Sequence, residues 1–113
     1  MSRHLFGKLL RVFVDEDDRL DGRPLHLAIV EALQAAGFSG ATVLKGIEGF
    51  GYSRKVRAAH AIDQALGMPV LIEVIDDEDK IAAFVPTLTA MMTSGLITLE
   101  RIELIHVVRE ETR

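Results

Sequence analysis

Residues 70–88, VLIEVIDDEDKIAAFVPTL, contain the pattern that decides the fold of this chain. Their first part, residues 70–75, is β-branched or apolar except for Glu73, and it directly follows Pro69. A short run of this composition beside a proline is typical of a β-strand. A strand is therefore predicted over residues 70–75.

The second part of the same stretch predicts a helix that ends near Gly95. Its apolar residues recur three or four positions apart, as on the buried face of a surface helix. Asp76 or Asp77 can accept hydrogen bonds from the first free backbone N–H groups of this helix. Pro86 lies inside it and removes one backbone hydrogen bond, which predicts a kink and not two separate helices. The apolar stripe consists of Ile81, Phe84, Leu88 and Met91.

Further runs on both sides of this stretch complete the pattern. They are a strand over residues 9–14, a loop over 15–22, a helix from Pro24 to Gly37, a strand over 41–48 and a strand over 99–108. The order strand, helix, strand, strand, helix, strand predicts an α+β, ferredoxin-like βαββαβ fold, in which two helices cover one face of a four-stranded antiparallel sheet. The length of 113 residues fits one such domain, residues 1–113.

The other face of this sheet is predicted to be left open. Because side chains alternate along a strand, one set faces the helices and the other does not. The helix-facing set is Leu10, Val12, Val14, Val70, Ile72 and Val74. The open set is Leu9, Arg11, Phe13, Leu71, Glu73 and Ile75. The open set is mostly apolar, which predicts a subunit interface, with ion pairs among Arg11, Glu73, Arg101 and Glu103.

The composition excludes several classes of function. The formal net charge of −4 argues against general binding to nucleic acids or membrane surfaces. With no cysteine there is no disulfide, zinc-thiolate site or thiol nucleophile. A hydrophobic fraction of 49% predicts a core that folds without a cofactor. The start, MSRHLFGKLLRVF, shows neither a signal-peptide nor a membrane-span pattern, so the expected location is the cytoplasm.

Residues 49–68, GFGYSRKVRAAHAIDQALGM, form a connection far longer than a β-hairpin needs. Glycines close to one another can turn backbone N–H groups toward an anion, and adjacent Arg and Lys side chains supply charge for phosphate. This composition predicts an anion-binding loop that includes Arg54, Lys55 and Arg57, with His60 beside them. The alternative is that the glycines only turn the chain and that the cations solvate an amphipathic helix over residues 55–66.

Several stretches together resemble the PII-like branch classified as domain of unknown function 190, across nearly the whole chain. They are GRPLHLAIVEAL at 22–33, KGIEGFG at 45–51, IDDEDKIAAFVPTL at 75–88 and GLITLERIEL at 95–104. The PII signalling proteins are similar where their second strand ends in Gly-Phe-Gly, matched here by residues 49–51.

The resemblance implies a homotrimer that binds small ligands, usually adenine nucleotides, in clefts between subunits at the base of the long loop. The loop then reports occupancy to a partner, a transporter or an enzyme, and genes of this branch often neighbour a fluoride exporter. The chain lacks the lysine-containing glycine-rich loop of PII proteins near residues 93–96, so AMP, ADP or a different anion is at least as suitable an effector as ATP. The implied ligand-binding residues are Gly46, Gly49, Phe50, Gly51, Tyr52, Ser53, Arg54 and Lys55.

Other candidate chemistry is weaker. The acidic runs 15–18 and 76–79 lack the ligand spacing of a calcium loop, and His4 and His106 would form only an incomplete metal site if the first and last strands pair. No nucleophile motif is present, so no enzymatic activity is expected. The alternatives to a nucleotide-binding regulator are a trimeric scaffold without a nucleotide and a metal-binding trimer resembling the copper-tolerance proteins.

Overall fold

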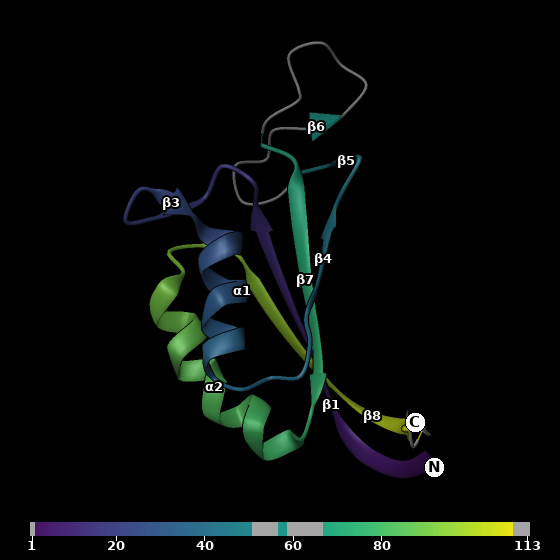
Figure 1. Ribbon diagram of the computed structural model, residues 1–113. Coiled ribbons are helices and arrows are strands. Elements are labelled where there is room, and N and C mark those ends of the chain that lie inside the picture. The colour runs from purple at the N-terminus through teal and green to yellow at the C-terminus, as the bar shows by residue number, and fades with distance from the viewer. Residues whose placement is uncertain (1, 51–56, 59–66, 110–113) are drawn as a thin grey trace.

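The computed structural model describes residues 2–50, 57–58 and 67–109 of the chain. Four of the strands form an antiparallel sheet in the order β4-β7-β1-β8, and both helices lie on one face of it (Figure 1). The predicted ferredoxin-like α+β fold is confirmed. In chain order the elements are β1 (Ser2–Asp15), β2 (Arg19–Leu20), β3 (Arg23–Pro24), α1 (Leu25–Ala35), β4 (Thr42–Lys45), β5 (Glu48–Gly49), β6 (Arg57–Ala58), β7 (Pro69–Asp76), α2 (Glu78–Met91) and β8 (Leu96–Val107).

The core lies between the sheet and the two helices. All of the side chains predicted to face the helices from β1 and β7 are buried. The helices contribute Leu25, Ile29 and Leu33 from α1 and Ile81, Phe84 and Leu88 from α2. No polar or charged side chain is buried in the described part of the chain, so the interior of this layer is held by apolar packing.

The end of α1 is fixed by backbone hydrogen bonds and by one lysine. Gly37 has φ +86°, its N–H donates to the Gln34 carbonyl at 3.1 Å, and the Phe38 N–H donates to the Leu33 carbonyl at 3.2 Å. This is the glycine-terminated arrangement expected from the sequence. Lys80 of α2 donates to the Gly37 carbonyl at 2.6 Å, which ties the two helices together.

Helix α2 passes through Pro86 as one helix, as predicted. The prediction of an aspartate side-chain cap is wrong. Asp77 is the residue before the helix, but its side chain makes no cap hydrogen bond, and the carboxylate of Asp76 accepts the N–H of Asp77 itself at 2.7 Å. Glu78 and Asp79 in the first turn complement the helix dipole instead.

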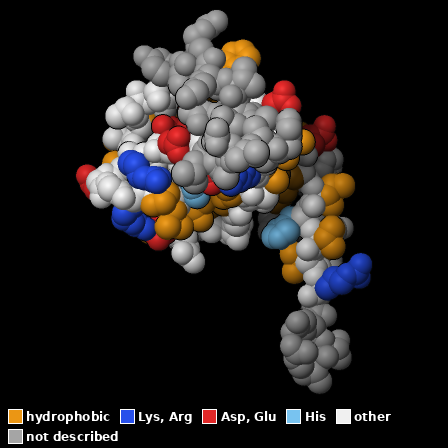
Figure 2. All heavy atoms as spheres, turned by 90° about the horizontal axis from the view of Figure 1, so that it is seen from above, with side chains coloured by type: hydrophobic (Ala, Val, Ile, Leu, Met, Phe, Trp, Pro, Cys, Tyr) orange, Lys and Arg blue, Asp and Glu red, His pale blue; other side chains and the backbone are white. Residues whose placement is uncertain are grey.

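Strands β1 and β8 extend beyond the rest of the sheet and form a two-stranded arm. Pairing of β1 with β7 stops at Lys8, whereas pairing with β8 continues to Ser2. Figure 1 shows the arm leaving the body at the end opposite the long connection, and Figure 2 shows hydrophobic side chains along it. A Cβ atom at Gly7 would lie 2.7 Å from the Asp76 carbonyl oxygen, so a glycine is needed where β7 leaves β1. The strand predicted from residue 9 is too short, because β1 already pairs with β8 from Ser2 onward.

Two small hairpins lie outside the main sheet. β2 and β3 pair around Asp21 and Gly22, which have φ of 52° and 82° and suit a tight two-residue turn. β5 pairs with β6 inside the long connection between β4 and β7. Among the described residues, no helix has both the length and the apolar character needed to cross a membrane.

Candidate functional site

The open face of the sheet has an apolar row that crosses all four strands in register next to the long connection. From β4 through β7 and β1 to β8, this row consists of Leu44, Leu71, Phe13 and Leu96. Leu44, Phe13 and Leu96 are exposed and Leu71 is half-buried. An exposed apolar band of this kind is typical of interaction surfaces.

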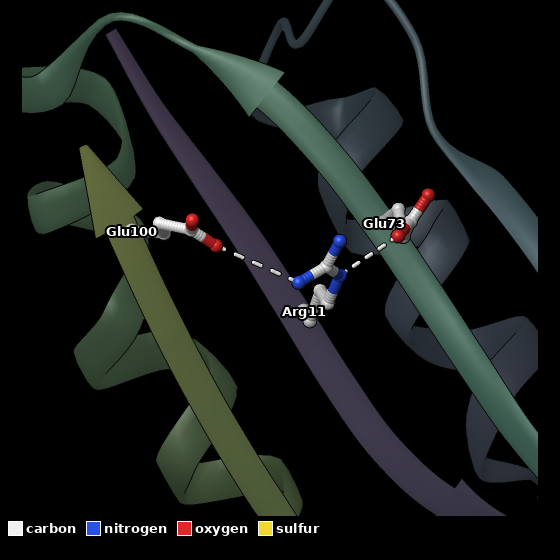
Figure 3. Close-up of polar contacts among 3 residues, drawn as sticks. All are labelled: Arg11, Glu73 and Glu100. Atoms are coloured by element: carbon white, nitrogen blue, oxygen red, sulfur yellow. Dashed lines mark hydrogen bonds and ion pairs between the residues drawn. The ribbon is translucent and has the colours of Figure 1, made fainter. Parts of the chain in front are cut away.

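A polar row follows on the same face and contains the predicted ion pair. The Arg11 Nε atom donates to a Glu73 carboxylate oxygen at 2.8 Å, and the Arg11 Nη1 atom lies 3.6 Å from Glu100 (Figure 3). The hydrogen bond with Glu73 raises the pKa of Arg11 above its ordinary value, although desolvation acts in the opposite direction. The guanidinium therefore stays charged between two carboxylates.

The predicted place of Arg101 and Glu103 on this open face is wrong. The register pairs Arg101 with Lys8, and both of these cations approach Glu78 at the start of α2, at 3.5 and 3.7 Å. Glu103 follows two residues later on the same face of the strand as Arg101. Glu100, one residue earlier, lies on the open face instead, because neighbouring residues of a strand point to opposite faces of the sheet.

A groove of about 570 Å³ opens beside the apolar row, at the end of the sheet where the long connection begins. Its volume is within the range of small-molecule sites, which is about 300–1,000 Å³. The apolar row lines it, together with Phe50 from the start of the connection, and its charged lining residues are Asp15, Asp18 and Lys45. Among the residues that the structure describes, the groove therefore combines an apolar wall with few charges.

The turn between α2 and β8 forms one side of this groove through Ser94, Gly95 and Leu96. Gly95 has φ +124°, and a Cβ atom there would lie 2.6 Å from the carbonyl oxygen of Phe13. The backbone thus crosses directly over β1 at a position that only glycine tolerates. Sequence reasoning did not select this turn as part of the ligand site.

The two ends of the long connection are joined at its base by Glu16. The Glu16 N–H donates to the Met68 carbonyl at 2.8 Å, and Lys45 Nζ donates to the Glu16 carboxylate at 2.8 Å. The hydrogen bond from Lys45 is the main cause that lowers the pKa of Glu16 below its ordinary 4.5, while burial acts in the opposite direction. The Gly46 N–H donates to the Pro69 carbonyl at 2.7 Å and closes the base beside this pair.

The structure brings three of the predicted ligand-binding residues to the groove end of the sheet. Gly46 lines the groove, but its N–H already donates to Pro69, so it offers no free backbone donor here. Gly49 is half-buried in β5, and Phe50 lines the groove with 63% of its surface exposed. The other predicted residues, Gly51, Tyr52, Ser53, Arg54 and Lys55, lie outside the described residues.

The alternative interpretation of residues 55–66 as one continuous helix is contradicted at Arg57 and Ala58. These two residues form strand β6 and pair with Gly49 and Glu48. Local helical spacing was overridden here by pairing with the preceding glycine-containing segment.

Histidines and acidic runs form no metal site in the part of the chain that the structure describes, where no group of three or more His, Asp or Glu side chains could hold a metal ion. The strand register aligns His4 with Ile105 and His106 with Arg3, so the two histidines are not opposite each other. In the acidic turn, the Asp18 carboxylate accepts the Asp15 N–H at 2.9 Å, which gives it a structural role.

The family model described as DUF190, Uncharacterized ACR, COG1993, matches residues 7–104. The chain belongs to the DUF190 family. A UPF0166 protein of Aquifex aeolicus is 36% identical over 99 residues, which cover 88% of this chain and 93% of that protein. A UPF0166 protein of Methanocaldococcus jannaschii is 34% identical over 107 residues, covering 94% and 95% of the two chains.

Solved structures of PII-like proteins share the fold of this DUF190 chain. A crystal structure from Thermus thermophilus, described as PII-like, superposes with a TM-score of 0.67 at 17% identity and covers 89% of this chain and 91% of that one. The PII-like protein CPII of Thiomonas intermedia, bound to ADP, AMP and bicarbonate, superposes with a TM-score of 0.60 at 18% identity, covering 90% and 91%. The family model confirms the predicted membership in the DUF190 branch, and the structural likeness confirms its PII-like fold.

Proposed function

We propose that this chain is a non-enzymatic, PII-like regulatory protein that binds an adenine nucleotide or a similar anion. It assembles as a homotrimer, and the ligand lies in clefts that neighbouring subunits form over the groove. Occupancy is signalled to a transporter or an enzyme through residues 49–68. The observation that supports this most is the groove itself, where an apolar row meets the exposed ring of Phe50.

The groove suits the base of a nucleotide better than it suits the phosphates. Phe50 and the apolar row offer a planar ring and aliphatic contacts for an aromatic base. The charged lining side chains that the structure describes are two aspartates, Asp15 and Asp18, and one cation, Lys45. Phosphate must therefore receive further positive charge, for which Arg54 and Lys55 are the candidates.

The remaining roles follow the sequence and the comparisons. Gly49 and Gly51 are proposed to present backbone donors, Tyr52 to pack beside the base with Phe50, and Ser53 to add a hydroxyl. Binding of ADP and AMP by CPII, which has the same fold, supports an adenine nucleotide as the ligand class. A fluoride exporter is the transporter that the family's gene neighbourhood indicates.

Calorimetry with AMP, ADP and ATP tests the proposal. We expect saturable binding, and we expect Arg54→Ala combined with Lys55→Ala to weaken it about tenfold or more, because charge-assisted hydrogen bonds contribute about 1.5–3 kcal/mol each. The matched control replaces two other exposed cations, Arg101 and Arg109, with alanine and should bind normally. Absence of binding heat and of a thermal shift with all three nucleotides would instead favour a trimeric scaffold.

A further inference from the structure

We infer that Glu16 is a positioning residue for Lys45: it holds the lysine ammonium group in the empty groove and competes for it with an incoming anion. This inference rests on the proposed function, because it specifies how the same groove receives its ligand. It assigns a role to a residue that does not itself line the groove.

The geometry separates the two members of the pair. Lys45 lines the groove, whereas Glu16 belongs to the turn after β1 and is not among the lining residues. Lys45 Nζ is 2.8 Å from the Glu16 carboxylate, with about half of the lysine side chain exposed. Because half of the Lys45 side chain is exposed, an anion in the groove can reach the ammonium group.

The charge balance makes Lys45 important to such an anion. Of the groove-lining residues that the structure describes, Lys45 is the only basic one, and two aspartates, Asp15 and Asp18, line the same groove. While Glu16 neutralises Lys45, the charges of the two aspartates are the ones that the described lining presents to an anion. A phosphate that binds to Lys45 must weaken the ion pair between Lys45 and Glu16. The loss of this ion pair lowers the net binding free energy of the phosphate.

Other charged groups also surround the Glu16 carboxylate. His26 of α1 contributes a favourable electrostatic interaction, and the Met68 N–H donates weakly at 3.5 Å. Arg19 reaches the backbone carbonyl of Glu16 at 3.4 Å, while Asp15 and Asp18 belong to the same turn. Lys45 is the largest cause of the lowered pKa, so its diversion to an anion should raise the Glu16 pKa.

The size of the effect follows from the exposure of the pair. An ion pair at the surface is worth at most about fivefold in an equilibrium constant. Glu16→Gln keeps the side-chain size and an acceptor for Met68 but removes the charge. We therefore expect this variant to bind ADP about two- to fivefold more tightly than the wild type.

A double-mutant cycle measured by calorimetry with ADP tests the role. Lys45→Met should weaken ADP binding. Glu16→Gln should leave the ADP affinity of the Lys45→Met variant unchanged, because the carboxylate acts through Lys45. Glu31→Gln is the matched control, since Glu31 forms a comparable exposed pair with Arg23 at 2.6 Å outside the groove. Unchanged or weaker binding by Glu16→Gln, or an equal gain without Lys45, would overturn the inference.

A second measurement decides the inference even if no nucleotide binds. Inorganic phosphate is titrated while the NMR signals of the Lys45 ammonium group and the Glu16 carboxyl group are followed. We expect phosphate to shift the Lys45 signal at lower concentration in Glu16→Gln, and to raise the Glu16 pKa in the wild type. Identical phosphate responses with and without the Glu16 charge would refute competition, whereas failure of nucleotides alone would refute only the proposed function.

Discussion

Replacing Ile75 with aspartate should dissociate the proposed trimer while leaving the subunit folded. Ile75 lies on the open face of β7, outside the groove, with 51% of its surface exposed. Complete burial of an isoleucine side chain is worth about 1.5–3 kcal/mol, so covering the remaining half contributes about 1 kcal/mol per subunit. An aspartate left unpaired in the same interface costs several kcal/mol more.

The summed penalty is about 10 kcal/mol or more over three subunits, which is enough to abolish assembly at micromolar concentration. Light scattering coupled to size exclusion measures the mass, and circular dichroism checks the fold. Leu27→Asp is the control, because Leu27 is 43% exposed on α1, away from the open sheet face. A wild-type monomer at micromolar concentration, or an Ile75→Asp variant that remains trimeric, would contradict assembly through the open sheet face.

Three further predictions concern stability. Gly95→Ala should lower the free energy of unfolding by about 2–4 kcal/mol, because the new Cβ meets the Phe13 carbonyl oxygen at 2.6 Å at a positive φ. Chemical denaturation measures this loss, and a value below about 0.5 kcal/mol would contradict the prediction. Lys80→Met should cost about 1 kcal/mol in the same assay, since it removes the hydrogen bond to the carbonyl after α1, and an unchanged midpoint would show that this bond contributes nothing. The lowered pKa of Glu16 stabilises the folded state above pH 4.5, and this contribution is lost as the pH falls through the lowered value. Glu16→Gln should therefore show a smaller loss of stability on acidification below pH 4.5, and parallel pH profiles would contradict the assignment.

The fold was predictable because β1, β7 and both helices have the apolar period that their packing requires. The alternation in β1 and β7 separated the buried residues from the open face correctly. The tight turn at Asp21 and Gly22 also has a recognisable sequence, an Asp-Gly pair, although the segment was predicted only as a loop. The register of β8 was not predictable with the same certainty, because its apolar residues occur on both faces.

The candidate site was predictable only in part. The glycines and Phe50 indicated where the long connection begins, and the structure places Phe50 in the groove. The pairing of Glu16 with Lys45 could not be inferred, because 29 positions of chain separate the two residues in the numbering and only the sheet brings them together. The hydrogen bond from the Gly46 N–H to the Pro69 carbonyl is likewise a tertiary contact, which the composition does not reveal.

A crystal structure of the wild-type protein grown with saturating ADP tests the central claim most directly. We expect a trimer with one nucleotide in each cleft, its base against Phe50 and the apolar row and its phosphates beside Arg54 and Lys55. A trimer whose grooves stay empty at saturating ADP, or a nucleotide bound away from the groove, would contradict the account.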